Sequence, residues 1–304
     1  MNFNQLKIFH TVAKRASFSL AGKDLYLSQP DISIQVRLLE DYFGVQLIER
    51  AGRNIKLTDA GEVLFSFAKR IFEISQEAEM VIADYRKLGE GILKIHTTRV
   101  LAKCYLPEIL NGFRKSHPKI KIVLKAGNSQ EAVGGVLNFE SDIAITGRIP
   151  YDKKLFAVPF FTDQVVLVSS IHNDLYKRKR INLKALTGKP IIIREDGSGL
   201  RNFTLELFKK EGVSPEFIME LGNDDAIKKA VEHGIGLSFM TYSMVREEAE
   251  RGILGVIELS NMKLIRDYDI VFHKVRKASN LIKAFVNEAL NAVLKLKEVN
   301  PHLG

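Results

Sequence analysis

The sequence predicts an α/β protein whose N-terminal domain is dominated by helices. Residues 1–60 contain three short helical patterns followed by the composition of a hairpin, and residues 59–88 repeat apolar side chains at three- and four-residue steps without a proline. From residue 91 onward, strand-like and helical stretches alternate, as in open α/β folds. Because 304 residues are many for a single core, more than one domain is expected.

The first two helices are predicted from caps and apolar spacing. Asn4 can cap a helix that ends near Ala16, because an asparagine side chain accepts a hydrogen bond from a free backbone N–H. Ser17 and Ser19 offer caps for a second short helix, which extends through Leu25. A tight turn is expected directly after that helix.

The third helix is predicted to begin at Ser28 and to end near Gly44. Asp31 follows Ser28 at the spacing of a capping box, and Pro30 lies in the first turn, where its missing N–H costs nothing. Strand-like residues on both sides of residues 51–54 then predict a hairpin.

The third helix has two faces of different character. One face carries Ile32, Val36, Leu39 and Phe43, and the opposite face carries Pro30, Ser33, Ile34 and Arg37. A capped helix with a polar outer face before a hairpin is typical of a winged helix-turn-helix, whose recognition helix lies in the DNA major groove. A small helical bundle with a polar surface helix explains the spacing equally well.

The helix predicted over residues 59–88 would be on the order of 45 Å long, which is longer than a compact domain needs. We therefore expect it to pair with another copy of itself, with packing on its own domain as the alternative. Glycines at positions 89 and 91 end it and mark the main domain boundary.

The region after this boundary alternates strands and helices. Strands are predicted at 91–97, 119–126, 142–146, 155–161, 164–170, 190–194, 217–221, 236–240 and 265–275, and helices at 101–116, 129–140, 199–211, 226–234 and 280–296. The pattern occurs twice, and the C-terminal segment is expected to return to the first half.

Composition and motifs exclude several classes of protein. No apolar run approaches the roughly 20 residues of a membrane helix, and the polar N-terminus does not resemble a signal peptide, so a cytoplasmic protein is expected. The single cysteine, Cys104, excludes an internal disulfide. Nucleotide-binding, zinc-protease and serine-hydrolase motifs are absent, and the seven histidines lack metal-ligand spacing, so neither catalysis, a metal nor a cofactor is expected. The net charge of +9 suggests an anionic partner but does not identify it.

Residues 1–62 resemble the DNA-binding domain of the LysR-type transcriptional regulators. The resemblance rests on LKIFHTVAKRASFSLAGKDLYLSQPDISIQVRLLEDYFGVQLIER, followed by LTDAGE, and continues through the whole chain. It implies a winged helix-turn-helix over 1–60, a linker dimerisation helix over 61–89 and an effector-binding domain over 90–304. That last domain is expected to have the two-lobed type II fold of periplasmic solute-binding proteins, with lobe I at about 90–162 and 267–304 and lobe II at about 163–266.

The resemblance also implies DNA-binding residues. It places in the groove Ser28, Gln29, Pro30, Ser33, Ile34 and Arg37, and in the wing Arg53 and Lys56. Gln29 and Arg37 have donors suited to base edges, whereas the wing residues suit phosphate or a narrow minor groove. Ile34 stands where the family often has a basic residue. An apolar side chain there can contact a thymine methyl but cannot hydrogen-bond a guanine.

Between the two lobes, four strand ends are expected to form an effector site. They supply Thr97, Thr98, Arg99, Asn128, Ser129, Thr146, Gly147, Ser198, Gly199 and Arg201. Helix starts and a guanidinium such as that of Arg201 favour a small anion, either an organic acid or an inorganic oxyanion. The plain alternative for residues 194–201 is a glycine-bearing turn.

The resemblance implies a transcription regulator that binds double-stranded DNA as a homodimer or a dimer of dimers, responds to a small anionic effector and contacts RNA polymerase. A different class remains open, namely a two-lobed solute-binding or catalytic domain with an N-terminal helical oligomerisation module. A third hypothesis is redox sensing, which with Cys104 alone would need a modification or a bridge between chains.

Overall fold

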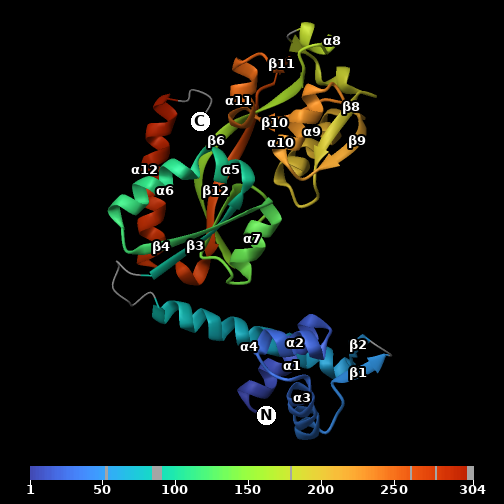
Figure 1. The fold of residues 1–304 in the computed structure, drawn as a ribbon, viewed down its shortest axis with the longest axis vertical. Helices are drawn as coiled ribbons and strands as arrows, with labels where there is room; N and C mark the ends of the chain where they lie inside the picture. Colours follow the sequence, from blue (N-terminus) through green and yellow to red (C-terminus); the bar gives the residue numbers. More distant parts are fainter. Residues whose placement is uncertain (52–53, 84–90, 179, 261, 278, 300–304) are drawn as a thin grey trace. The chain divides into compact units, whose positions relative to one another are not determined.

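The computed structural model describes residues 1–51, 54–83, 91–178, 180–260, 262–277 and 279–299 (Figure 1). The chain divides into two compact units, Met1–Ala83 and Asp84–Gly304.

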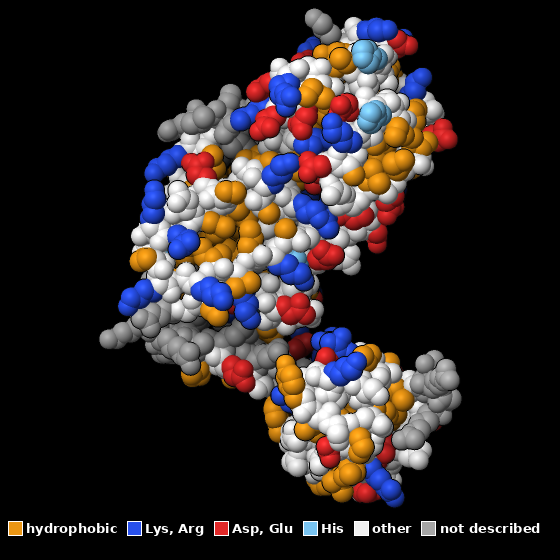
Figure 2. Space-filling model, viewed as in Figure 1, with side chains coloured by type: hydrophobic (Ala, Val, Ile, Leu, Met, Phe, Trp, Pro, Cys, Tyr) orange, Lys and Arg blue, Asp and Glu red, His pale blue; other side chains and the backbone are white. Residues whose placement is uncertain are grey.

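In the face drawn in Figure 2, Lys and Arg side chains are interspersed with Asp and Glu. The positive net charge is therefore not gathered into one patch on this face.

The N-terminal unit contains four helices and one hairpin among its described residues. They are α1 (Phe3–Arg15), α2 (Phe18–Leu25), α3 (Gln29–Phe43), β1 (Ile48–Ala51), β2 (Asn54–Leu57) and α4 (Asp59–Ala83). Three helices followed by an antiparallel hairpin confirm the predicted arrangement. Their apolar faces share one core, which includes Phe9, Val12, Ile32 and Leu39. Residues 84–88 of the predicted long helix lie outside the described residues.

Two details of this unit differ from the predictions. Asn2, not Asn4, caps α1, because its side chain accepts from the Gln5 backbone N–H while the Gln5 side chain accepts from the Asn2 backbone N–H. This reciprocal pair satisfies two groups at the helix start. Phe43 is 40% exposed, so it does not join the buried stripe of α3. It is the last residue of the helix, and its ring contacts the exposed Tyr42.

The C-terminal unit is a two-lobed α/β structure. Its elements are β3 (Gly91–Thr98), α5 (Arg99–Cys104), α6 (Leu106–Ser116), β4 (Ile120–Gly127), α7 (Ser129–Leu137), β5 (Ile143–Gly147), β6 (Leu155–Ser170), α8 (Asp174–Lys177), β7 (Arg180–Ile181), η1 (Leu183–Leu186), β8 (Pro190–Arg194), α9 (Gly199–Glu211), β9 (Glu216–Leu221), α10 (Asp224–Glu232), β10 (Ser238–Thr241), α11 (Tyr242–Glu250), β11 (Leu254–Leu259), β12 (Leu264–His273), η2 (Lys274–Arg276) and α12 (Asn280–Val299). The open α/β prediction is confirmed, but α8, β7, η1, α11, β11 and η2 were not predicted.

One sheet has the strand order β4-β3-β5-β12-β6-β11-β7, with β10 also on β6. Its first half, β3 to β5, together with α5 to α7 and α12, forms lobe I, in which α6 and α12 cover one face and α7 the other (Figure 1). Lobe II contains α8 to α11 and β7 to β11. Strands β6 and β12 belong to both lobes: β6 pairs with β12 over 155–165 and then with β10 and β11 over 165–170.

Two predictions for the C-terminal unit were wrong about where an element is interrupted. The segments 155–161 and 164–170 are not separate strands but one strand, β6. Its register against β12 shifts between Tyr268 and Asp269, opposite Pro159, and such an irregularity lets a strand continue past a residue without an N–H. Conversely, the helix predicted at 101–116 is broken at Tyr105, and Pro107 lies in the first turn of α6.

Two neighbouring glycines of α7 offer a matched test of lobe I packing. A β-carbon on Gly134 would meet no atom within 4 Å, whereas one on Gly135 would lie 2.8 Å from His96 Nδ1. We expect Gly134→Ala to raise the free energy of unfolding by up to about 1 kcal/mol through helix propensity. Gly135→Ala should lower it by about 1–3 kcal/mol through overpacking. Urea denaturation of both variants measures this, and equal shifts would contradict the close approach of α7 to β3.

Candidate nucleic-acid interface and ligand cavity

Helix α3 is held at both ends by local interactions. The Ser28 hydroxyl accepts from the Asp31 backbone N–H at 3.3 Å and donates to the Asp31 carboxylate at 2.5 Å. Gly44 ends the helix in the left-handed conformation with φ of 68°, which a residue without a β-carbon adopts without strain. Both ends are therefore specified by the sequence, and the orientation of the outer face follows from them.

The two faces of α3 differ as predicted. Ile32, Val36 and Leu39 are at most 2% exposed and hold the helix to α1 and α2. On the outer face Ile34 is 54% exposed, and Arg37 is exposed with no ion pair to the described part of the chain.

The remaining predicted groove residues also lie on this exposed side. Ser28, Gln29 and Pro30 are exposed and Ser33 is half-buried. The Gln29 side-chain amide donates to the Ser33 hydroxyl at 3.2 Å. In the hairpin, Lys56 is exposed opposite Glu49, and Arg53 lies outside the described residues. The outer face thus presents several donors together with the apolar side chains of Pro30 and Ile34.

Helix α4 is apolar on two sides. One side packs on α1, where His10 stacks on Phe65 at 5.2 Å between ring centroids and Phe3 meets Phe72 edge-on at 4.9 Å. The other side leaves large apolar side chains exposed by 37–68%, namely Val63, Phe67, Ile71, Ile74 and Ile82. A contiguous apolar stripe of this kind on a surface helix marks an interaction site.

Within the C-terminal unit, a small cavity lies where the two lobes meet. Its volume is about 20 Å³, and its walls are Thr98, Arg99, Val100, Gly127, Asn128 and Ser129 of lobe I, Arg194, Ser198, Leu200 and Thr241 of lobe II, and Arg266 and Tyr268 of β12. Five of the ten predicted effector residues, Thr98, Arg99, Asn128, Ser129 and Ser198, therefore line one cavity. Room for about one water-sized group remains in it.

The lobes are joined around this cavity by hydrogen bonds. The Gln130 backbone N–H donates to the Gly197 carbonyl at 3.2 Å, and the Asn128 side chain donates to the Asp196 carbonyl at 3.4 Å. The Arg99 guanidinium pairs with the Glu195 carboxylate at 2.9 Å. These contacts link the starts of α7 and α9, whose positive dipole ends both lie at the cavity.

The other five predicted effector residues do not line the cavity. Thr97 and Thr146 are buried, and their hydroxyls donate to the backbone carbonyls of Ile145 and Gly147. Arg201 donates to the Arg194 carbonyl at 2.8 Å and to the Glu220 carboxylate at 2.6 Å.

Gly147 and Gly199 have an indirect role. A β-carbon at either position would overlap the guanidinium of Arg266, so both positions accommodate that side chain.

Arg266 is the main cavity residue that the sequence did not point to. It is only 7% exposed, and burial lowers the pKa of its guanidinium, which the nearby positive charge of Arg194 lowers further. Its guanidinium lies 5.6 Å from the centre of the Tyr268 ring. The available signal was an arginine within the predicted strand 265–275, because a charged residue in a central strand is seldom buried without a partner.

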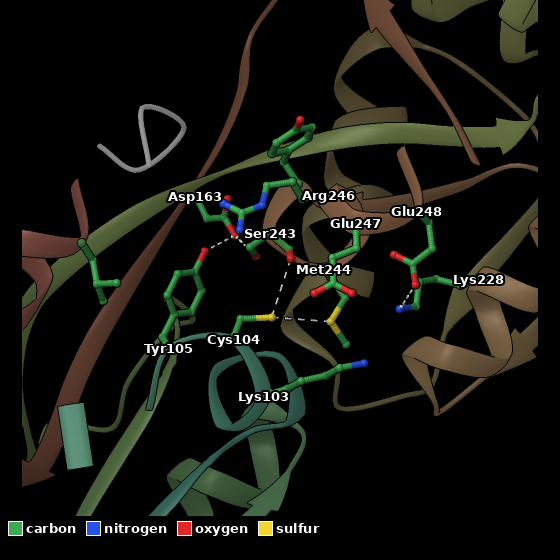
Figure 3. Close-up of a pocket in the computed structure, with 12 residues that line it drawn as sticks. Lys103, Cys104, Tyr105, Asp163, Lys228, Ser243, Met244, Arg246, Glu247 and Glu248 are labelled. Atoms are coloured by element: carbon green, nitrogen blue, oxygen red, sulfur yellow. Dashed lines mark hydrogen bonds and ion pairs between the residues drawn. The ribbon is translucent and has the colours of Figure 1, made fainter. Parts of the chain in front are cut away.

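Cys104 lies elsewhere, in a pocket of about 350 Å³ whose walls include residues of α5, β6, α10 and α11 (Figure 3). Its thiol points toward the Ser243 carbonyl at 3.7 Å and the Met244 sulfur at 3.8 Å (Figure 3). Burial and the nearby Asp163 carboxylate raise its pKa to about 11. A thiol in this state is poorly nucleophilic at neutral pH, which disfavours the redox hypothesis.

Comparison with known proteins decides the family. Residues 3–62 match the family described as "Bacterial regulatory helix-turn-helix protein, lysR family", and residues 86–293 match "LysR substrate binding domain". The chain belongs to the LysR family. It is 31% identical to the HTH-type transcriptional activator CmpR of Synechocystis over 284 residues, which is 93% of each chain.

Solved structures of LysR-type regulators share this fold. Full-length OxyR from Pseudomonas aeruginosa has a TM-score of 0.67 at 19% identity and covers 95% of this chain and 94% of its own. The regulatory domain of Synechocystis CcmR, solved in complex with 2-PG, has a TM-score of 0.62 at 24% identity over 66% of this chain and 97% of that domain.

The family assignment settles the function class. LysR-type proteins are DNA-binding transcription regulators with an effector-binding domain and are not enzymes, so this chain is such a regulator. A solute-binding or catalytic protein with an oligomerisation module is thereby excluded. No described helix of the LysR-family chain is long and apolar enough to cross a membrane. Among its described residues, no group of His, Cys, Asp or Glu is arranged to hold a metal ion.

Because only the thiolate reacts, Cys104 should alkylate far more slowly at neutral pH than a cysteine in an unstructured peptide, and its rate should rise toward the raised pKa of about 11. Mass spectrometry of a pH series of labelling reactions measures this, with the peptide as control. Cys104→Ser should bind DNA like the wild type with and without peroxide. A peroxide effect on DNA binding that disappears in Cys104→Ser would reinstate the redox hypothesis.

Proposed function

We propose that two copies of this regulator pair through α4 and read a two-fold DNA site with the outer faces of their α3 helices, under control of a small anion bound between the lobes. The observation that carries the DNA-reading part is the doubly capped α3, whose outer face is exposed and whose Arg37 has no ion pair within the described residues. An exposed guanidinium without an intramolecular acid is available for a guanine edge or a phosphate.

The proposed groove residues are Ser28, Gln29, Pro30, Ser33, Ile34 and Arg37, with Lys56 and Arg53 in the wing. Donors on the first turn and on Arg37 suit base edges, and Ile34 suits a thymine methyl. Lys56 is exposed on a hairpin strand and suits a phosphate. In this proposal, α3 makes the contacts to DNA bases, and the wing supplies much of the electrostatic affinity for DNA.

The proposal for the dimer rests on the exposed stripe of α4. Its five large apolar side chains are costly in water, and a two-fold partner helix would remove them from it. Symmetric pairing also suits a two-fold DNA site. The proposal also includes assembly into a dimer of dimers, a cytoplasmic location and contact with RNA polymerase. The family's role in transcription supports these three points.

The effector part rests on the convergence of two helix starts and three arginines on one cavity, which favours negative charge. CcmR, whose regulatory domain has the same fold, was solved with 2-PG, an anion. A ligand that binds two lobe arrangements with different affinity shifts their populations and so alters the spacing of the recognition helices.

Arg37→Ala should lose both affinity and sequence preference, because a good side-chain contact to a base edge contributes about 1–3 kcal/mol of discrimination. Lys56→Ala should weaken binding to all sequences alike and reduce the salt dependence of log K by about one unit. Electrophoretic retardation on the DNA upstream of the protein's own gene and on scrambled DNA, at two salt concentrations, measures both. Equal weakening on the two DNAs for Arg37→Ala would remove it from base reading.

Ile74→Asp, at a position 62% exposed in the apolar stripe, should dissociate the dimer, because pairing would bury its charge. Ser66→Asp introduces the same charge at an exposed position beside the stripe and is the matched control. Sedimentation velocity of the full-length chain reports the mass. A dimer that survives Ile74→Asp and also Phe67→Asp would exclude α4 as the pairing surface.

A further inference from the structure

Building on the proposed function, we propose that Arg266 is the principal anion-binding residue of the inter-lobe cavity, and that the effector carries a fully ionised oxyanion group such as a phosphate, sulfate or carboxylate. The effector would supply the counter-ion that Arg266 lacks among the described residues. Arg201, which the sequence favoured for this role, is engaged by Glu220 instead.

The Arg266 guanidinium carries a charge that the cavity wall does not balance. Arg266 is only 7% exposed, and its guanidinium makes no hydrogen bond or ion pair to the described part of the chain. A buried charge without a partner is among the most costly features of a protein interior. Burial accordingly lowers its pKa, and the ring of Tyr268 offers only a weaker attraction.

The other two arginines in the cavity wall are already neutralised by ion pairs. Arg99 pairs with Glu195, and Arg194 pairs with both Glu195 and Asp224. Burial lowers the pKa of Arg194, but its hydrogen bonds to Glu195 and the charge of Asp224 outweigh burial and leave the pKa raised. For Arg266, burial outweighs the contributions of Tyr268, Tyr151 and Asp163, which act to raise the pKa, and leaves the pKa lowered. An incoming anion therefore gains most at this residue.

Acids on neighbouring elements do not take the place of that anion. Asp163 lies opposite Arg266 in the β6–β12 ladder, but its carboxylate accepts from the Tyr105 hydroxyl at 2.9 Å and the Ser243 hydroxyl at 2.5 Å. Asp269, further along β12, binds Arg148. Each carboxylate is engaged by other donors, as Figure 3 shows for Asp163, and the charge of Asp163 does not outweigh the burial of Arg266.

The rest of the cavity wall offers hydroxyl groups that can donate hydrogen bonds. The Thr98 hydroxyl is buried there and has no hydrogen-bond partner among the described residues. Ser129 begins α7 and Ser198 caps α9 without a side-chain cap hydrogen bond, so both hydroxyls lie at positive helix ends. These groups can donate to an oxyanion, and they come from both lobes. A neutral or cationic ligand would leave Arg266 unpaired.

The glycines beside Arg266 support a specific placement of its side chain. Gly147 and Gly199 have no β-carbons, and any β-carbon there would overlap the guanidinium. Backbone from lobe I and lobe II thus encloses the charge from two sides. Because the cavity holds only about 20 Å³, an effector larger than a single small group can enter only if the lobes separate. Anion binding at Arg266 is therefore coupled to lobe movement.

The test uses the full-length protein and inorganic phosphate, sulfate and formate as probes, with urea at equal concentration as a neutral control. Phosphate should raise the Tm of the wild type, because a ligand that binds only the folded state stabilises it. Arg266→Met should lose this shift, whereas Arg266→Lys should keep a reduced one, with phosphate bound about tenfold more weakly as bidentate contacts are lost. Arg180→Met, which removes an exposed arginine paired with Glu258, should respond like the wild type.

A second readout separates this role from a merely structural one. Removing an unpaired buried charge should leave the ligand-free Tm of Arg266→Met equal to or above that of the wild type. If Arg266 were only a packing residue, the Tm would fall while the phosphate shift remained, and that result overturns the proposal. The absence of a shift with all three anions in the wild type overturns it as well.

The DNA readout keeps the two proposals apart. All four proteins should retard the upstream DNA in the absence of anion, because Arg266 lies outside the DNA-binding unit. If the wild type binds DNA and responds to phosphate, but Arg266→Met responds equally, the Arg266 assignment fails and the proposed function stands. If the wild type does not bind the DNA specifically, the proposed function fails regardless of what phosphate does to the Tm.

Discussion

The antiparallel pair β6–β12 is the constraint on which the C-terminal unit depends. Ten residue pairs join the two strands, and β6 alone extends through 16 residues. Lobe I packs its largest apolar cluster on one end of this pair, including Phe161 and Tyr268, and lobe II packs Val165 and Leu264 at the other end. Any rotation of one lobe against the other must bend these two strands or break contacts beside them. Arg266 lies in this strand pair, opposite Asp163.

Local chemistry explains why much of the fold was predictable. Ser17, Ser28 and Gly44 specify helix ends within a few residues, and such short-range signals do not depend on the rest of the chain. The continuity of β6 was not predictable in this way. Pro159 signals an end in sequence, but a register shift opposite it, which only the pairing with β12 creates, lets the strand continue.

In the inter-lobe cavity, too, some residues could be predicted from local sequence and others depend on tertiary packing. Residues that follow a strand or begin a helix, such as Thr98, Asn128 and Ser198, were found because strand ends converge by topology. Arg266 was missed because it lies inside a strand, and its surroundings come from glycines more than 60 residues away in the chain. Arg201 stood at the expected helix start, yet Glu220 on the neighbouring β9 takes its charge. Sequence identifies candidates, whereas only packing shows which charges are already paired.

Arg37 and Arg266 form no ion pair with the described residues, but they differ in burial, and this difference suits them to different ligands. Arg37 is exposed, so water solvates its charge, and the charge costs little free energy in the absence of DNA. Its contribution to DNA affinity is screened by salt. Arg266 is buried, so its unpaired charge is costly in the closed, ligand-free arrangement and is relieved either by an anion or by opening to water. An effector that pairs with Arg266 therefore favours the lobe arrangement that has room for it. Differential affinity of this kind is what a ligand needs to shift a conformational equilibrium.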